Sequence, residues 1–138
     1  MTTAMVTVLV VDDEPLILGL CERMLRLGRY AVFTAGSGEE ALPYLQKNTV
    51  PIDLALLDVM MPGMNGVELA GWIQNAAPST RVVLMTGFRP GEVGRLIKNA
   101  AWPVIWKPFR VESFLHAIEN ALQDRPVELL GPKSLPEP

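Results

Sequence analysis

Five polar residues stand directly behind apolar segments of strand length, and their types suit phosphoryl chemistry. Asp12 and Asp13 follow one such segment, Asp58 follows a second, Thr86 a third and Lys107 a fourth. If these segments are parallel strands of one sheet, their carboxyl ends share an edge, and that edge is where such sheets bind ligands. We therefore expect the five side chains to form one site.

Three carboxylates gathered at one edge need a cation. Each close pair repels by about 1 kcal/mol in water and by about 4 kcal/mol at an effective dielectric constant near 20. Mg²⁺ is commonly held by one or two carboxylates together with retained waters, which leaves a position for a phosphoryl oxygen. The lysine adds a positive charge and the threonine a hydroxyl, so the pocket could neutralise a phosphoryl group during transfer, with one carboxylate as the nucleophile.

Apolar segments of strand length alternate with amphipathic helical patterns along the whole chain. This alternation is typical of a doubly wound parallel α/β sheet that is covered by helices on both faces. We expect strands at 6–11, 30–35, 53–57, 81–85 and 104–106. We expect helices from Pro15 until Gly28 ends the first, from Ser37, after the turn at 61–66 to about Ala76, from Pro90, and at about 111–122.

Two of the predicted helices carry local signals. Apolar residues of the first helix form two adjacent rows, both expected to face the sheet: Leu16, Leu20 and Met24, and Ile17, Cys21 and Leu25. At the start of the second helix, Ser37 and Glu40 have the spacing of a capping box. Pro43 lies inside that helix and removes one backbone donor, so we expect a kink there.

Length and composition favour one globular domain. The chain has 138 residues, 49% of them hydrophobic, a net charge of −3 and Cys21 as its single cysteine. These values argue against a disulfide framework and against general nucleic-acid binding. No apolar run is long enough to span a membrane and no secretory signal is present, so we expect a cytoplasmic protein. We expect the domain to cover 1–123 and a proline-rich tail or linker to cover 124–138.

Four motifs, in order, resemble the receiver domain of two-component response regulators. The resemblance covers about Val6 to Leu122 and implies a flavodoxin-like fold with five parallel strands in the order 2-1-3-4-5. The motifs are Val10-Val11-Asp12-Asp13-Glu14-Pro15, Leu57-Asp58-Val59-Met60-Met61-Pro62-Gly63-Met64-Asn65-Gly66, Met85-Thr86-Gly87 and Trp106-Lys107-Pro108-Phe109.

The resemblance implies a role for each residue of the site. Asp58 would accept a phosphoryl group, Lys107 would pair with the phosphoryl oxygens, and Thr86 would move to hydrogen-bond them. Mg²⁺ would be the cofactor, with these ligands: Asp12 through water, Asp13, Asp58 and the backbone carbonyl of Met60. The peptide bond before Pro108 is usually cis in the family. Such a domain is no separate enzyme, although it would catalyse its own phosphorylation and slow dephosphorylation.

The resemblance also implies partners and an output surface. The phosphodonor would be a histidine kinase or a histidine phosphotransfer domain, with no nucleic acid or membrane as partner. The chain would be a stand-alone receiver or part of a longer hybrid kinase. Phosphorylation would shift the face formed by the helix from Pro90, the strand at 104–106 and the last helix, and a homodimer could form there. Most receivers carry an aromatic residue or histidine three residues before the lysine, whereas this chain has Val104 there. We therefore hypothesise that Trp102, Trp106 or motion of the helix from Pro90 reports the phosphorylated state.

Two other functions are compatible with parts of the sequence. The segment Gly36-Ser37-Gly38-Glu39-Glu40-Ala41 matches a dinucleotide-binding pattern, but two glutamates where a pyrophosphate must approach argue against it. The stronger alternative is a Mg²⁺-dependent phosphatase that forms an aspartyl phosphate, resembling the haloacid dehalogenase group. That group expects an Asp-x-Asp motif and an acidic pair after the lysine, whereas here only Glu112 follows Lys107 nearby.

Overall fold

The helices and strands of the computed structural model follow the predicted alternation. The structure describes residues 5–46, 50–87, 94–95, 97 and 101–123. The strands are β1 (Thr7–Val11), β2 (Ala31–Ala35), β3 (Leu54–Asp58), β4 (Arg81–Thr86) and β5 (Val104–Trp106). The helices are α1 (Pro15–Leu27), α2 (Gly38–Gln46), α3 (Gly66–Ala76) and α5 (Val111–Leu122). The helix expected from Pro90 lies largely outside the described residues, of which 94, 95 and 97 are helical.

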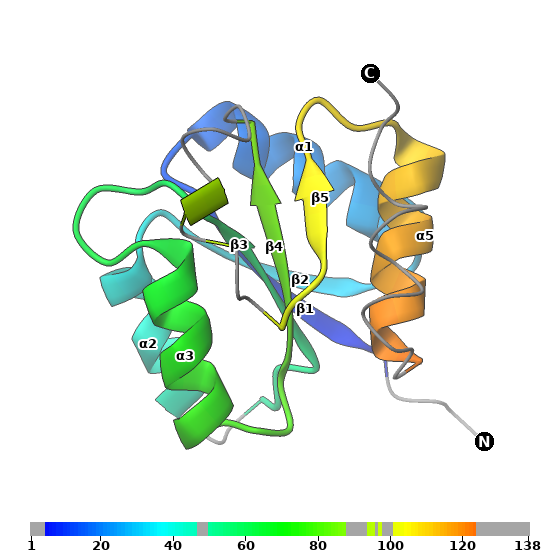
Figure 1. Ribbon diagram of the computed structural model, residues 1–138. Helices are drawn as coiled ribbons and strands as arrows, with labels where there is room; N and C mark the ends of the chain where they lie inside the picture. Colours follow the sequence, from blue (N-terminus) through cyan, green and yellow to red (C-terminus); the bar gives the residue numbers. More distant parts are fainter. Residues whose placement is uncertain (1–4, 47–49, 88–93, 96, 98–100, 124–138) are drawn as a thin grey trace.

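The five strands form one parallel sheet in the order β2-β1-β3-β4-β5. Figure 1 shows α2 and α3 on one face of this sheet and α1 and α5 on the other. The predicted fold class and strand order are therefore confirmed. One boundary differs in a way that matters for the site, because Asp58 is the last residue of β3 and pairs with Met85 of β4. Its backbone is thus held by the sheet ladder.

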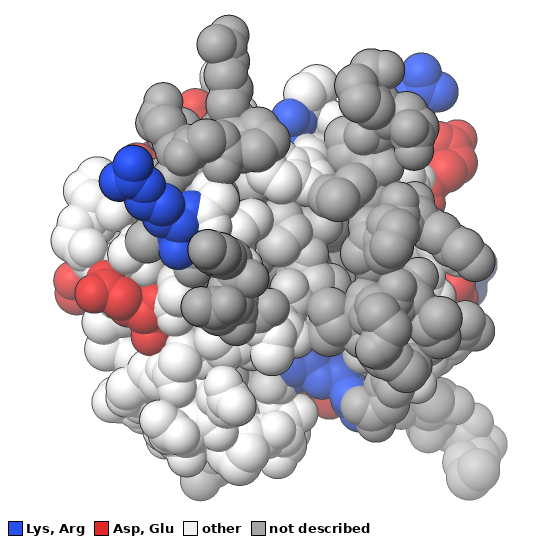
Figure 2. Space-filling model, in the orientation of Figure 1, with Lys and Arg blue, Asp and Glu red and all other residues white. Residues whose placement is uncertain are grey.

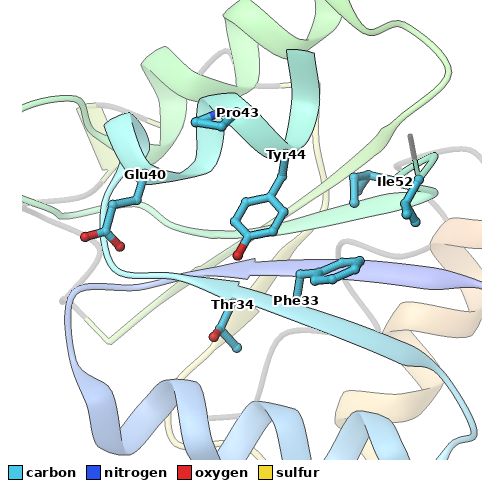
Figure 3. A pocket seen from close by; sticks show the side chains of 7 residues that line it. Phe33, Thr34, Glu40, Pro43, Tyr44 and Ile52 are labelled. Carbon is cyan, nitrogen blue, oxygen red and sulfur yellow. The ribbon is translucent and has the colours of Figure 1, made fainter. Parts of the chain in front are cut away.

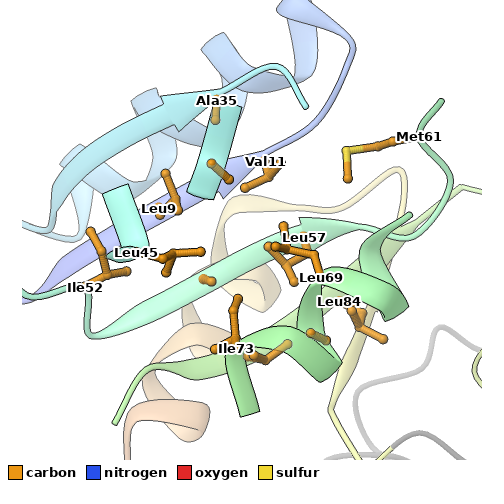
Figure 4. Packing of buried hydrophobic residues seen from close by; sticks show 14 of the residues in the cluster. Leu9, Val11, Ala35, Leu45, Ile52, Leu57, Met61, Leu69, Ile73 and Leu84 are labelled. Atoms are coloured by element: carbon orange, nitrogen blue, oxygen red, sulfur yellow. The ribbon is translucent and has the colours of Figure 1, made fainter. Parts of the chain in front are cut away.

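Each face of the sheet has its own apolar core. The α2/α3 cluster draws on alternate strand residues, among them Leu9, Leu57 and Leu84, and packs them against Leu69 and Ile73 of α3 (Figure 4). The α1/α5 cluster uses the intervening strand residues and fills the other face: Val8, Val10, Leu54, Leu56, Val83, Met85 and Ile105, with Cys21, Met24, Leu25, Phe114 and Ile118 from the helices. Side chains of successive strand residues point to opposite faces, so a single strand serves both clusters.

The prediction for the first helix was wrong in part. Cys21, Met24 and Leu25 of α1 are buried, whereas Leu16 is 88% exposed and Leu20 is 44% exposed. The two rows together span about half the circumference of a helix, more than the stripe that a helix lying on a sheet must bury. Leu27, 71% exposed, adds to the apolar side chains that α1 leaves in solvent.

The start of α2 differs slightly from a capping box. The hydroxyl of Ser37 accepts a hydrogen bond from the amide of Glu40 at 3.1 Å, as predicted. The Glu40 carboxylate accepts from the amide of Gly36 at 2.8 Å and so reaches one residue further back than a capping box requires. The helix continues through Pro43 to Gln46. A complete capping box stands instead at α3, where Asn65 and Glu68 accept from each other's backbone amides.

Charged side chains do not gather into one patch on the face of the molecule drawn in Figure 2. Figure 2 shows acidic and basic residues scattered over one face, with uncharged surface between them. Among the described residues, no helix is long and apolar enough to cross a membrane.

Candidate functional site

The three aspartates predicted to meet do so at the carboxyl edge of the sheet. Asp12 and Asp13 follow β1, Asp58 ends β3, and these two strands are neighbours. One carboxylate oxygen from each lies within 4.8 Å of the other two. Asp12 is fully buried, Asp58 is 4% exposed, and Asp13 faces solvent. We call this cluster the acidic pocket; two of its members are buried and one is open to solvent.

Lys107 reaches this pocket from the end of β5. Its Nζ donates to Oδ2 of Asp12 at 2.8 Å and lies 3.6 Å from Oδ1 of Asp58 and 3.8 Å from Oε1 of Glu14. The other oxygen of Asp12 accepts from the amide of Glu14 at 2.9 Å. Both oxygens of Asp12 are therefore occupied, which fixes this carboxylate and, with it, the ammonium group beside Asp58.

The buried carboxylate of Asp58 is costly to ionise. Burial, the largest cause, and the negative charge of Asp12 raise the pKa of Asp58 from 3.8 to about 7. The positive charge of Lys107 and a hydrogen bond from the backbone of Met60 lower the pKa, but by less. Desolvation and a like charge both disfavour the charged form of a carboxylate. A cation bound at the pocket would remove much of this cost.

The same acidic neighbours favour the protonated, positively charged form of Lys107. Burial lowers its pKa, but the hydrogen bond to Asp12 and the negative charges of Asp58, Asp12 and Glu14 outweigh burial and raise the pKa above its ordinary value. Lys107 is therefore an ammonium ion at neutral pH. Its charge lies 3.6 Å from the carboxylate of Asp58, the residue that the resemblance implies as the phosphoryl acceptor.

Thr86 lies at the same edge, between the acidic pocket and β5. It is fully buried and ends β4, which pairs with β3 on one side and with β5 on the other. Its carbonyl oxygen accepts from the amide of Lys107 at 2.8 Å. The peptide bond between Lys107 and Pro108 is cis, as the resemblance implied.

A glycine supports Asp58 from behind. The amide of Gly66, the first residue of α3, donates to the carbonyl of Val59 at 3.0 Å. A Cβ atom at Gly66 would lie 2.3 Å from the carbonyl oxygen of Asp58, closer than real Cβ atoms approach a backbone oxygen. The absence of a side chain is what lets α3 begin directly against the end of β3.

Two contacts of the site were not predicted from the sequence. Glu14 contributes a second acidic neighbour to Lys107, and its place beside Asp12 and Asp13 was the only signal for it. Cys21 of α1 is affected by the charges of the site: burial raises its pKa to about 12, the charge of Asp12 raises it further, and that of Lys107 opposes the increase. The thiol is therefore un-ionised and serves the apolar core.

The donor set fits a hard divalent cation. All the candidate side chains offer oxygen atoms, and two of the carboxylates are buried beside each other. Oxygen ligands from one or two carboxylates, with waters completing the shell, are what Mg²⁺ prefers. Asp13, which faces solvent, would give such an ion a route of entry.

A family model described as the response regulator receiver domain matches residues 8–119. Among curated proteins, the chain is 34% identical over 120 residues to a cyclic di-GMP phosphodiesterase of Thermotoga maritima, covering 86% of this chain and 32% of that protein. It is 32% identical over 119 residues to the heme response regulator HssR of Staphylococcus aureus strain Newman, covering 86% and 52%. The chain thus spans about a third and about half of the length of these relatives.

A solved structure shares the fold. The response regulator protein TrrA of Thermotoga maritima, in complex with Mg²⁺ and BeF, matches with a TM-score of 0.72 and 31% identity, covering 85% of this chain and 99% of that one. The segment matched by the family model contains all five residues of the site, from Asp12 to Lys107.

Proposed function

Because this chain belongs to the response regulator receiver domain family, we propose that Asp58 accepts a phosphoryl group in two-component signalling. The observation that carries the proposal is the position of the Asp58 carboxylate, buried at the end of β3 with the ammonium group of Lys107 3.6 Å away. A carboxylate held beside a fixed positive charge can act as a nucleophile toward phosphorus while the charge developing on the phosphoryl oxygens is neutralised.

In the proposed reaction, an oxygen of Asp58 forms a bond to phosphorus as the bond from phosphorus to the donor's histidine nitrogen breaks. The electron pair of that bond stays on the imidazole, which then takes up a proton. Lys107, which bonds Asp12 at 2.8 Å and lies 3.6 Å from Asp58, would pair with the oxygens of the transferred group. Thr86, at the end of the next strand, is the hydroxyl donor for the new phosphoryl oxygens.

We propose that Mg²⁺ is held by Asp12 through water, by Asp13 and Asp58 directly, and by the carbonyl of Met60. The ion would offset the negative charge of the carboxylates and of the incoming phosphoryl group. Its binding would also favour the ionised, nucleophilic form of Asp58, whose pKa is about 7 in the metal-free pocket.

The proposed phosphodonor is a histidine kinase or a histidine phosphotransfer domain. A surface beside the site supports a contact with such a protein, because α1 begins immediately after the acidic residues and leaves Leu16 and Leu20 of its first half in solvent. Exposed apolar side chains next to a reaction site favour docking of the protein that delivers the reacting group.

The output of the proposed switch involves β5. Val104 is half-buried. The indole nitrogen of Trp106 is buried and has no hydrogen-bond partner among the described residues, and Trp106 pairs in register with Thr86. This supports Trp106 over Trp102 as the tryptophan that reports phosphorylation. Most of the helix from Pro90, which would complete the output face and its homodimer contact, lies outside the described residues. We propose that the receiver unit ends near residue 123, with 124–138 as a tail or linker.

The phosphatase alternative gains no support. Glu112, its only candidate acid after the lysine, is exposed at the start of α5, and it forms no ion pair with another described residue. The matching family model is that of a signalling domain.

Intact mass after incubation with acetyl phosphate and Mg²⁺ tests the proposal. We expect a gain of one phosphoryl group in the wild type and none in Asp58→Asn or when the metal is chelated. Asp53→Asn is the matched control: Asp53 precedes β3 and accepts from the amide of Thr7 at 2.8 Å, a bond that asparagine can keep. Modification that persists in Asp58→Asn would show that another residue is the acceptor.

A further inference from the structure

The outer edge of β2 is open. The sheet ends at β2, whose inward-facing groups bond to the segment that contains β1: the amide of Ala31 donates to the carbonyl of Val6, and the carbonyl of Ala35 accepts from the amide of Asp12. Because successive residues of a parallel strand turn their backbone groups to opposite sides, those of Val32 and Thr34 face away from the sheet. In the described part of the chain, neither residue has a hydrogen bond on that side.

The sequence of β2 does nothing to prevent pairing at this edge. Natural edge strands are commonly protected by charged residues, by proline or by a bulge. β2 reads Ala-Val-Phe-Thr-Ala, contains none of these residues, and pairs with β1 in an unbroken register from Ala31 to Ala35. The edge is therefore suited to receive another strand.

The open stretch is short and symmetric. The next outward-facing residues already use their amides within the chain: Tyr30 donates to the carbonyl of Leu25 at 3.1 Å and Gly36 to the carboxylate of Glu40 at 2.8 Å. Within the described ranges, only Val32 and Thr34 remain, placed equally on either side of Phe33. A strand of the same sequence, running antiparallel about Phe33, would match Val32 to Thr34 and Thr34 to Val32.

We propose that two copies of this protein pair through β2, antiparallel about Phe33, to form one continuous ten-stranded sheet. The two outward-facing matches each exchange two backbone hydrogen bonds, which gives about four bonds across the dimer axis. The two Phe33 side chains then occupy a non-hydrogen-bonded position, where side chains of opposite residues approach most closely.

A groove beside the edge leaves apolar side chains for the second copy to cover. A cavity of about 630 Å³ lies between β2 and α2 and includes Phe33, Pro43, Tyr44 and Val50 in its lining. The Phe33 and Tyr44 rings are 5.3 Å apart, and Tyr44 and Val50 are 38% and 41% exposed. In the proposed dimer the two-fold axis passes between the two Phe33 residues, so the groove of one copy lies beside the groove of the other.

The charges at the two ends of the β2 edge are complementary when two copies pair antiparallel about Phe33. Glu40 and Ile52 lie at opposite ends of the cavity (Figure 3), so the symmetry keeps the two Glu40 carboxylates apart. Arg29 lies two residues before β2, and Glu40 is held by the Gly36 amide directly after β2, so antiparallel pairing brings Arg29 of one copy to the end of the edge where Glu40 of the other lies. Arg29 is exposed and forms no ion pair with another described residue. One contact between Arg29 of one copy and Glu40 of the other would form at each end of the paired strands and would stabilise the dimer.

Analytical ultracentrifugation tests the proposal. Because the ladder of hydrogen bonds is short, we expect the dimer to bury less than about 1,200 Å² and to dissociate readily. Protein concentrations up to about 1 mM are therefore needed to populate it. We expect a concentration-dependent dimer for the wild type. Thr34→Pro removes only the outward amide, a change that edge strands tolerate, and should weaken the dimer at least about tenfold. Thr34→Val keeps the amide and should leave the dissociation constant within about twofold.

Further variants keep the test valid if Thr34→Pro fails to fold. Thr34→Lys protects the edge with a charge and should also give monomers. Arg29→Glu and Glu40→Lys should each weaken the dimer, and the double variant should restore it. A wild-type chain that stays monomeric at about 1 mM would overturn the proposal. So would a dimer unchanged by both Thr34→Pro and Thr34→Lys, since the contact would then lie on another face. Neither outcome bears on phosphorylation of Asp58, which the mass measurement decides.

Discussion

Replacing Asp58 with asparagine should stabilise the metal-free protein at neutral pH. Burial and the charge of Asp12 raise the pKa of Asp58 from 3.8 to about 7, so the folded state favours its protonated form. That preference contributes stability below pH 3.8, where the group is protonated in both states, and the contribution is lost as the pH rises through about 7. Above that pH the wild type must hold an ionised carboxylate in a buried acidic pocket.

The size of the effect follows from the shift. One pKa unit corresponds to about 1.36 kcal/mol, so the rise from 3.8 to about 7 amounts to about 4 kcal/mol. Asparagine removes the charge and can still accept the hydrogen bond from Met60, but its amide group lies near Lys107 without an acceptor, at a cost of about 1–3 kcal/mol. We expect a net gain of about 1–3 kcal/mol, or roughly 5–15 °C in melting temperature.

Thermal unfolding in EDTA, followed by circular dichroism between about pH 5 and 8, measures this gain. The difference between Asp58→Asn and the wild type should grow with pH and level off above about 7. Saturating Mg²⁺ should reduce or reverse it, because the ion binds the folded wild type and stabilises that state. A variant less stable than the wild type in EDTA at pH 8, or a difference that does not change with pH, would refute the reasoning.

Two further predictions concern the surroundings of the site. Gly66→Ala would place a Cβ atom 2.3 Å from the carbonyl of Asp58, so we expect at least about 2 kcal/mol of destabilisation in urea and loss of phosphoryl acceptance. Gly71→Ala is the control: it lies in the same helix, its new Cβ would meet nothing within 4 Å beyond the backbone of that helix, and it should stabilise by about 0.5–1 kcal/mol. If both alanines behave alike, the close approach is not what excludes a side chain. The double variant Leu16→Ser and Leu20→Ser should slow phosphoryl transfer from a protein donor about tenfold while leaving transfer from acetyl phosphate unchanged. Equal effects on both donors would refute a docking role for α1.

The fold and the meeting of the site residues could be predicted because strands are short and directional. An apolar segment followed at once by Asp, Thr or Lys fixes both the end of the strand and the edge at which the polar side chain emerges. The structure brings Asp12, Asp13, Asp58, Thr86 and Lys107 to that edge, as predicted. The roles of these residues stay predictions until phosphorylation is measured.

Other details depend on tertiary packing, which a sequence pattern does not contain. The apolar rows of α1 were too wide, and only contact with β1, β2 and α5 decides that Cys21 and Leu25 are buried while Leu16 is not. The rotamer of Lys107, which bonds Asp12 at 2.8 Å rather than Asp58, depends on the buried surroundings of both carboxylates. Spacing along the chain identifies neighbours, but it cannot rank two acceptors that lie at the same edge.

The division of the interior into an α2/α3 cluster and an α1/α5 cluster affects how this protein can change. The sheet separates the two sets of side chains, so substitutions on opposite faces share few contacts and their effects on stability should add. An evolving or engineered variant could therefore repack the α2/α3 side, which borders the β2 edge, without readjusting the side that contains α1 and α5. Epistasis should concentrate instead at the carboxyl edge, where Asp12, Asp58 and Lys107 join strands that contribute to both clusters.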